Sequence, residues 1–179
     1  DDGLQHYRLR RDLEIAVVDS RGFGNGWLLP AGPLREPPRR LRSVDAVVLH
    51  GTPQNENWSA KTFEMRLEGE VAHRMSDARD RQPLQAWRGR TLHAVAGIGN
   101  PSRFFLHVGK LGPKVVPHPF PDHHRFGAED LEFGDSAPVL MTEKDAVKLR
   151  GHARADWWVL PVTAQLDPGF GEWLLRTLD

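Results

Sequence analysis

The sequence predicts an α/β protein, and two observations lead to this fold class. Residues 13–19 and 43–50 are apolar runs without the polar alternation of a half-exposed strand, which is typical of strands buried in a parallel sheet. From Leu92 onward, predicted strands alternate with predicted helices. Strands that are joined by crossover connections form parallel sheets with helices packed on their faces.

The region between and after the two apolar runs contains loop and edge signals. Gly22–Gly26 is rich in glycine and predicts a loop. Pro33 is expected in the first turn of a short helix, which the prolines that follow it would end. Residues 62–71 alternate between apolar and polar side chains, as in a half-exposed strand. We expect a connecting region at about 52–88.

The second half of the chain is predicted as a series of strands and helices. Asn100 and Thr142 are each expected to cap a helix, because a short polar side chain can bind a free amide of the first turn. Thr142 and Glu143 are explained by capping, although a helix N-terminus can also hold an anion. The strands are expected at 92–98, 114–116, 138–141 and 157–162, and the helices at 101–111, 128–133, 143–152 and 169–178.

Composition and charge exclude several classes of protein. The chain has 179 residues, of which 39% are hydrophobic and 27% charged, which is typical of a globular protein. Its 24 basic and 24 acidic residues balance, which argues against a surface that gathers nucleic acid. The absence of cysteine excludes disulfides, iron–sulfur clusters and cysteine nucleophiles. No apolar run approaches the roughly 18 residues that a membrane span needs.

Neither of two glycine-containing segments matches a phosphate-binding motif well. The pattern G-x-x-x-x-G-K-[ST] is absent, because Gly109-Lys110 is followed by Leu111 and Phe104 stands at the position of the first glycine. The segment Gly97–Pro101 lies between a strand and a helix, as a dinucleotide turn does. It lacks the third glycine, and Pro101 removes an amide donor, so it is a poor candidate for a nicotinamide site.

The chain begins with Asp1-Asp2-Gly3. Two carboxylates at the end of a strand are suited to a magnesium-bound nucleotide, because Mg²⁺ prefers oxygen ligands. The same three residues also fit a simple turn. Since the sequence contains no strand before them, we expect the chain to belong to a longer protein.

Three histidines and one aspartate lie within residues 118–124 on a loop that contains prolines. Such a cluster could be a transition-metal site. It could also supply a general base, with Asp122 orienting an imidazole. The third interpretation is that these are exposed loop histidines, and the sequence leaves the three open.

Taken together, five segments resemble the tetraacyldisaccharide 4'-kinase family, the lipid A 4'-kinases of Gram-negative bacteria. The resemblance covers residue 1 to about residue 165. It implies phosphorylation of the 4'-hydroxyl of tetraacyldisaccharide 1-phosphate with ATP and Mg²⁺. The implied fold is the remainder of a P-loop kinase core plus a smaller α/β domain joined by a β linker. The segments, in chain order, are DDGLQH at 1–6, LLPAGPLREP at 28–37, GIGNPSRFF at 97–105, DHH at 122–124 and MTEKDAVK at 141–148.

The resemblance also implies roles for individual residues. Asp1 and Asp2 would lie beside the magnesium and the phosphates. Asp2, Arg35 and His123 would be catalytic, with Arg35 on the phosphate side and His123 paired with an upstream aspartate that acts as the base. The residues expected to bind substrate or nucleotide are Gln5, His6, Asn25, Arg35 and Glu36.

The resemblance further implies an organisation and a location. Residues 1–51 would be the end of the kinase core, 52–88 the linker and 89–179 the smaller domain. The phosphate loop, the base aspartate and a membrane-associating segment would lie upstream. We therefore expect the 179-residue chain alone to be inactive. The resemblance places the enzyme at the cytoplasmic face of the inner membrane, in peripheral contact with lipid through that upstream segment.

The residues alone leave two alternatives to the kinase. The first is a metal-dependent hydrolase or binding module built on His118, Asp122, His123 and His124, and the second is a folded remnant without catalytic activity. A tightly bound zinc ion would favour the first alternative. The arginines that follow Arg35 are expected to be solvated, so that substitution of Arg40 should change little.

Overall fold

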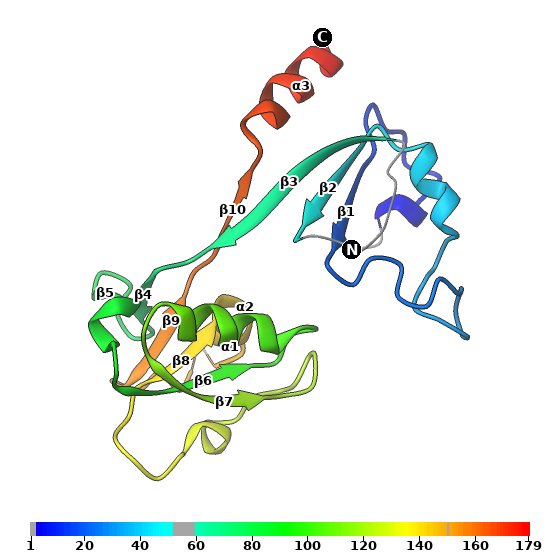
Figure 1. Cartoon of the computed structure of the whole chain (residues 1–179). Coiled ribbons are helices and arrows are strands. Elements are labelled where there is room, and N and C mark those ends of the chain that lie inside the picture. The colour runs from blue at the N-terminus through cyan, green and yellow to red at the C-terminus, as the bar shows by residue number, and fades with distance from the viewer. Residues whose placement is uncertain (1–2, 52–59, 150) are drawn as a thin grey trace. The chain divides into compact units, whose positions relative to one another are not determined.

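The structure is a computed structural model that describes residues 3–51, 60–149 and 151–179. The chain divides into two compact units, the first formed by residues 1–67 with 164–179 and the second by residues 68–163. Each unit has its own sheet, and both sheets contain parallel strands (Figure 1). The predicted α/β fold class is confirmed.

The sheet of the first unit has the strand order β1-β2-β3-β10. The strands β1, β2 and β3 run parallel, and the last residues of β1 and β2, Asp19 and His50, lie opposite each other. The two apolar runs of the sequence are therefore neighbours at the carboxyl end of a parallel pair. The strand bounds are β1 (Ile15–Asp19), β2 (Ala46–His50), β3 (Lys61–Glu68) and β10 (Thr163–Leu166).

The crossover from β1 to β2 differs from the prediction. It contains the 3-10 helix η2 (Pro38–Arg42), and another 3-10 helix, η1 (Gly3–Gln5), precedes β1. The short helix expected to begin at Pro33 does not form, because Leu34 pairs with Leu28 in a parallel bridge. The prolines thus shape an irregular loop instead of opening a helix.

The helix α3 (Pro168–Leu178) returns to the first unit. The Asp167 carboxylate accepts a hydrogen bond from the Gly169 amide at 2.8 Å, which caps the helix. The rings of Phe170 and Trp173 pack against Phe63 of β3 with centroid separations of 5.1 and 5.2 Å. These aromatic contacts explain why the end of the chain groups with β3.

The sheet of the second unit has the order β5-β4-β9-β8-β6-β7. The strands β6, β7, β8 and β9 are parallel, whereas β4 runs antiparallel to β9 and to β5. The strand bounds are β4 (Val71–Arg74), β5 (Arg81–Pro83), β6 (Thr91–Ala96), β7 (Lys114–Pro119), β8 (Val139–Thr142) and β9 (Trp157–Leu160).

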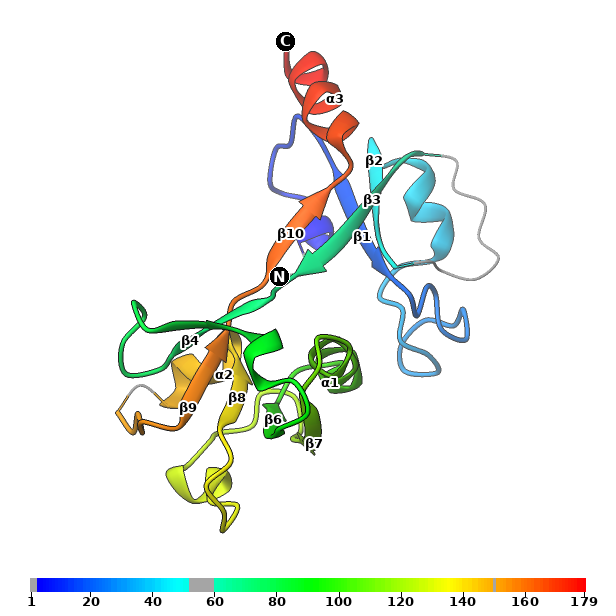
Figure 2. The same ribbon diagram turned by 60° about the vertical axis from the view of Figure 1, so that its left-hand side comes forward.

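Alternating side chains of these strands fill two cores, one on each face of the sheet. Leu92, Ala94 and Ala96 of β6 pack with α1 (Pro101–Lys110) and the 3-10 helix η3 (Leu84–Trp87). On the opposite face Val95 packs with elements that include α2 (Glu143–Ala146), η5 (Val147–Leu149) and η4 (Ala128–Leu131). Figure 2 shows α1 and α2 on opposite sides of the sheet.

Several local predictions differ from the structure of the second unit. The Asn100 side chain makes no capping hydrogen bond, whereas Thr142 does cap α2, its hydroxyl oxygen accepting from the Asp145 amide at 3.2 Å. The helix expected over 143–152 is a short α-helix that continues as 3-10 through Leu149, and the one expected over 128–133 is the 3-10 helix η4. The strands β5 and β10 have no counterpart in the sequence-based prediction.

The compact units follow different boundaries from those expected at residues 51 and 88. Leu84 and Trp87 of the expected linker are buried in the core of the second unit. Residues 164–179, expected in the smaller domain, group with the first unit. None of the helices in the described part of the chain is long and apolar enough to cross a membrane.

Candidate active site

The first unit has a cavity of about 550 Å³ against β1 and the carboxyl ends of β1 and β2. Ligands of parallel α/β sheets bind at this end of the strands, and cavities of this size hold small molecules. Both the loop after β1 and the segment that leads into η2 contribute to its wall. The polar side chains among the lining residues are Gln5, Asp19, Arg21, Arg35, Glu36, Arg40 and His50.

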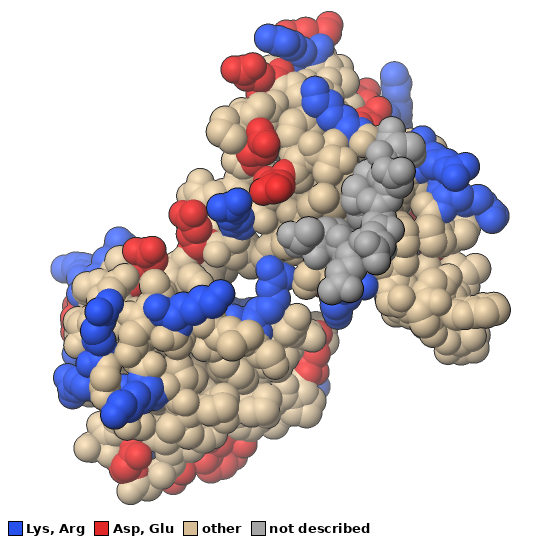
Figure 3. Space-filling view, viewed as in Figure 1, with Lys and Arg blue, Asp and Glu red and all other residues tan. Residues whose placement is uncertain are grey.

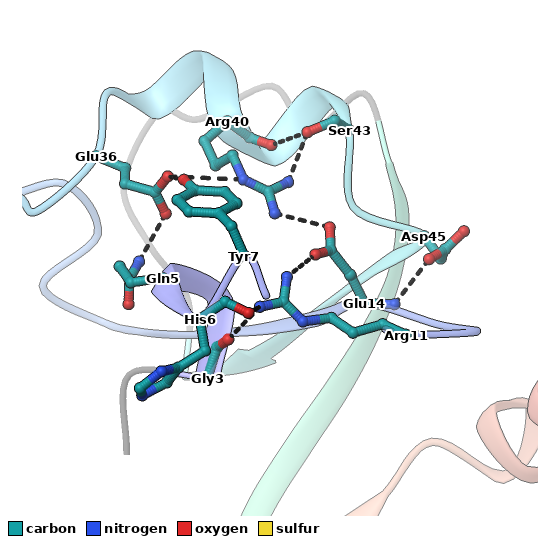
Figure 4. A network of polar contacts seen from close by, with 10 residues as sticks. All are labelled: Gly3, Gln5, His6, Tyr7, Arg11, Glu14, Glu36, Arg40, Ser43 and Asp45. Atoms are coloured by element: carbon teal, nitrogen blue, oxygen red, sulfur yellow. Dashed lines mark hydrogen bonds and ion pairs between the residues drawn. The ribbon is translucent and has the colours of Figure 1, made fainter. Parts of the chain in front are cut away.

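Glu36 organises one wall of this cavity (Figure 4). Its carboxylate accepts hydrogen bonds from the Tyr7 hydroxyl and, at 2.6 Å, from the Gln5 amide nitrogen, and Arg40 Nε lies 3.7 Å away. The hydrogen bond from Tyr7, helped by Gln5 and Arg40, lowers the pKa of Glu36, although partial burial opposes this. The same bond raises the pKa of Tyr7. Glu36 is therefore held ionised by its own neighbours.

Arg40 and Glu14 extend this network away from Glu36. Arg40 donates to the Glu14 carboxylate at 2.7 Å and to the Ser43 hydroxyl at 2.6 Å. Glu14 also pairs with Arg11, which in turn donates to the carbonyl oxygens of residues 3 and 6 at 2.7 and 2.6 Å. The hydrogen bonds from Arg40 and then Arg11 lower the pKa of Glu14, and Glu14 raises the pKa of Arg40. Alternating charges thus connect the segment before β1 to η2.

The structure corrects the expectation for Arg40. Its side chain is only 17% exposed and bridges two carboxylates, so it is not a solvated arginine. The expectation failed because its partner Glu14 lies 26 residues earlier in the chain. Arg39, by contrast, is exposed.

The structure brings three of the predicted binding residues together at the cavity, namely Gln5, Arg35 and Glu36. Arg35 is exposed there, whereas Gln5 and Glu36 bind each other. His6 does not line the cavity; its carbonyl accepts from Arg11, and Figure 4 shows its imidazole directed away from the network. Asp1 and Asp2, the predicted magnesium ligands, lie outside the described residues.

The Asn25 side chain binds within its own loop. Its side chain donates to the Ala31 carbonyl and accepts from the Trp27 amide, both at 3.1 Å. Asn25 thereby closes the loop that follows β1. It does not line the cavity, so the structure gives it a loop-closing role, and its predicted contact with ligand stays a prediction.

A second set of polar residues gathers at the carboxyl edge of β6, β7 and β8 in the second unit. Asp122 follows β7 and accepts a hydrogen bond from Lys144 Nζ at 3.0 Å, which is the main cause of its lowered pKa. Gly99, which follows β6, lies beside this carboxylate, since a Cβ there would be 3.7 Å from Asp122 Oδ2. The loops after two strands and the start of α2 therefore meet at one edge.

His123 projects from this edge in an unusual backbone conformation. Its φ is +63°, the left-handed region that few residues other than glycine adopt. The turn is held by the His124 amide, which donates to the Pro121 carbonyl at 3.1 Å, and by the His123 amide, which donates to Asp122 at 3.0 Å. The imidazole is 80% exposed, with Nε2 3.8 Å from Asp122 Oδ2. An outward-facing side chain on a strained backbone is typical of a functional position.

The other two histidines of the 118–124 cluster point elsewhere. His118 Nε2 lies 2.8 Å from Nδ1 of the buried His93, and burial with the nearby His93 lowers the pKa of His118. His124 binds Asp130 at 3.0 Å. In the described ranges, no three His, Asp or Glu side chains are grouped so that they could hold a metal ion. The structure does not support a metal site built on this cluster.

The sequence analysis missed several residues that build these two sites. Asp145 is fully buried and accepts from the Gly97 amide at 2.9 Å, from the Thr142 hydroxyl at 2.7 Å and from Lys148 at 2.9 Å. Its position three residues after a capping threonine was a usable signal. For Arg11, Glu14 and Tyr7 the only local signal was the spacing of Arg11 and Glu14.

The fold and the cavity define an α/β protein with a ligand site at the carboxyl ends of parallel strands. The sequence comparisons specify which one. The chain belongs to the tetraacyldisaccharide-1-P 4'-kinase family, whose sequence model matches residues 1–179. This confirms the family resemblance of the motifs.

Individual relatives agree with this assignment. A tetraacyldisaccharide 4'-kinase of Azoarcus sp. is 53% identical over 99% of this chain and 53% of its own length. One from Pseudomonas aeruginosa is 48% identical over 100% of this chain and 53% of its own length. The crystal structure of LpxK from Aquifex aeolicus in complex with ATP is 29% identical, with a TM-score of 0.71, over 99% of this chain and 55% of that one. The chain thus spans about half the length of these relatives.

Proposed function

We propose that this chain takes part in ATP-dependent phosphorylation of the 4'-hydroxyl of tetraacyldisaccharide 1-phosphate, a step of lipid A biosynthesis. The observation that carries the proposal is the family match over the whole chain. The cavity of the first unit supports it, because it combines an exposed arginine with a preorganised polar wall. Phosphoryl transfer depends mainly on positioning and on neutralising phosphate charge.

Arg35 is the residue that we assign to the transferring phosphate. It lies at the cavity next to Glu36, which the Tyr7, Gln5 and Arg40 side chains hold in place. A guanidinium offers two parallel donors to a phosphate, which lysine cannot reproduce. The neighbouring network therefore fixes the backbone from which Arg35 extends, and the Arg35 side chain supplies the charge.

His123 is assigned to the proton transfer. An imidazole that pairs with a carboxylate orients that carboxylate. The pairing also makes the carboxylate better able to accept the proton of the sugar hydroxyl. The exposed ring of His123 and its strained backbone fit this task. The aspartate that would act as the base belongs to sequence beyond this chain, as the family resemblance implies.

The proposed cofactors are ATP and Mg²⁺, with Asp1 and Asp2 as the magnesium ligands. Mg²⁺ would neutralise phosphate charge when it is bound. The lipid disaccharide is the proposed acceptor, and no nucleic-acid partner is proposed. We place the protein at the cytoplasmic face of the inner membrane, in peripheral contact with lipid.

Arg35 provides the sharpest test of the proposal. The assay uses a chimera in which this chain replaces the matching segment of the Azoarcus relative, with ATP, Mg²⁺ and the lipid acceptor. Arg35→Ala should lower kcat about 10²–10³-fold, the usual loss for one charge-stabilising donor, and Arg35→Lys nearly as much. The exposed neighbour Arg39→Ala is the matched control and should leave kcat unchanged.

Two outcomes would contradict these assignments. Wild-type turnover of Arg35→Ala would remove Arg35 from the phosphate site. An inactive chimera would contradict the proposed function itself. The 179-residue chain alone is the baseline of the assay and should leave the acceptor unmodified.

His123 is tested in the same chimera against His118. His123→Ala should lower kcat about 10²–10⁴-fold, the range of general acid–base assistance. His118→Ala should have a small effect on kcat, because that ring is engaged with His93. Equal and small effects of both substitutions would exclude His123 from the mechanism.

A further inference from the structure

The loop after β1 has an uncharged and apolar tip. No charged residue lies between Arg21 and Arg35. Within this stretch three consecutive apolar side chains are exposed, Trp27 by 67%, Leu28 by 43% and Leu29 by 61%. Single exposed apolar residues are common on proteins, whereas a contiguous group marks an interaction surface.

Hydrogen bonds within the loop fix its backbone in a conformation that leaves these apolar side chains on the surface. The Leu29 amide donates to the Leu34 carbonyl at 2.8 Å, and the Leu34 amide donates to the Trp27 carbonyl at 3.2 Å. Asn25 bridges the two sides of the loop through the contacts described above. A Cβ at Gly32 would collide with Asn25 Oδ1, so the chain needs glycine there. The backbone polar groups are thus bonded inside, and Trp27–Leu29 point outward.

The loop extends away from β1 and β2 in Figure 1, and the surface over it is free of charge in Figure 3. Basic residues follow it directly. Arg35, which ends the uncharged stretch, lines the cavity, whereas Arg39 and Arg42 are exposed on η2. The acidic neighbour Glu36 is already paired. An apolar tip with arginines at its base complements the acyl region and the anionic headgroups of a bilayer.

We propose that Trp27, Leu28 and Leu29 insert into the interfacial region of an anionic lipid bilayer and hold the first unit against it. A bilayer is favoured over a protein partner for two reasons. The surface is a protruding loop and not a groove, and its largest side chain is tryptophan, which prefers the interface between headgroups and acyl chains. This contact is separate from the upstream segment expected from the family resemblance, and it does not depend on the proposed phosphoryl transfer.

The test measures binding of the 179-residue chain to vesicles of phosphatidylcholine with phosphatidylglycerol. Flotation should recover the wild-type chain with the vesicles, and the variant Trp27→Ser/Leu29→Ser should partition at least about tenfold less. The matched control is Leu106→Ser/Leu175→Ser, which removes two residues of similar exposure, 65% and 67%, outside the loop. This control should bind as the wild type does, and circular dichroism should show that both variants are folded.

A second measurement reports insertion directly. Lipids brominated along the acyl chain should quench part of the tryptophan fluorescence of bound wild-type protein. Trp27→Phe should still bind the vesicles but should no longer be quenched. The five other tryptophans of the chain would still fluoresce in this variant, so the loss would assign the quenching to Trp27.

Three results would overturn the proposal. The first is wild-type protein that does not bind the vesicles. The second is binding that survives Trp27→Ser/Leu29→Ser. The third is self-association that this variant abolishes in the absence of lipid binding, which would assign the loop to a second copy of the chain. None of these results involves a kinase assay, so they leave the proposed function unaffected.

Discussion

The two units each use a carboxylate to tie loops together at a parallel sheet, but at different depths. In the second unit Asp145 is fully buried and joins the loop after β6 to α2. In the first unit Glu14 keeps 19% side-chain exposure and joins the segment before β1 to η2 through two arginines. The hydrophobic core is also larger in the second unit than in the first. Among the residues that the structure describes, the two clusters of the second unit hold eleven and nine buried residues, whereas those of the first hold three each.

This difference indicates where each unit obtains its stability. The stabilising effect of a buried carboxylate depends on all of its partners. A charge or a hydrogen-bond donor without a partner lowers the free energy of unfolding much more inside a protein than at its surface. A partly exposed pair retains access to water and contributes less. The second unit should therefore respond to polar substitutions as a core does. The first unit should lose local order around its cavity before it loses its fold.

The largest expected effect is that of Asp145→Ala. It leaves the Gly97 amide without its partner and Lys148 without its counter-charge. We expect a loss of about 3 kcal/mol, the lower end for a broken buried pair, because Lys148 retains 24% exposure. Urea unfolding measures it. Asp145→Asn, which keeps an acceptor for Gly97, should cost less. A loss below about 1 kcal/mol for Asp145→Ala would contradict the comparison.

Arg40→Ala should have an intermediate effect. It removes the donor of Glu14 and of Ser43 and a counter-charge of Glu36, so we expect a loss of about 1–3 kcal/mol. The exposed neighbour is the matched control, and Arg39→Ala should stay within about 0.5 kcal/mol. Thermal unfolding of both variants decides the matter. Equal values would mean that the network of the first unit contributes nothing to its stability.

The smallest effect concerns pH and His118. Burial and His93 lower the pKa of the folded His118 below the value of about 6.5 of an unfolded chain. In the pH window just below about 6.5 the unfolded state therefore binds more protons at this histidine, and stability falls as the pH falls. The pKa of the nearby Asp135 is lowered by the Ala137 amide and His93, so this carboxyl titrates below that window.

The measurement compares melting temperatures at pH 7.5 and 5.5. His118→Gln should show a smaller decrease than the wild type, and the exposed His152→Gln should not differ from it. An unchanged decrease in His118→Gln would show that other groups set the pH dependence.

The sequence predicted those features that depend on near neighbours in the chain. The strands β1 and β2 followed from two mostly apolar runs, and the cap of α2 followed from Thr142. It could not predict contacts between distant segments. The bond from Arg40 to Glu14 spans 26 residues, and the bond from Gly97 to Asp145 spans 48.

The same limit applies to β10 and to the candidate site. Every residue of β10 is exposed, so this strand has no apolar pattern of its own and is defined by its place beside β3. Arg35 and His123 were predicted through a family resemblance. Their surroundings, which decide what each side chain can do, required the fold.

The strand order has a consequence for how such a protein can change. The chain leaves the first unit through β3 and returns through β10, and these two strands are neighbours in one sheet. Just beyond them the chain is equally close, since a Cβ at Gly69 would lie 2.6 Å from the Pro161 carbonyl oxygen. The two ends of residues 68–163 thus lie close together. Closing a loop costs little when its ends already lie together. Residues 68–163 could therefore be replaced by another domain without rebuilding the sheet from which they extend.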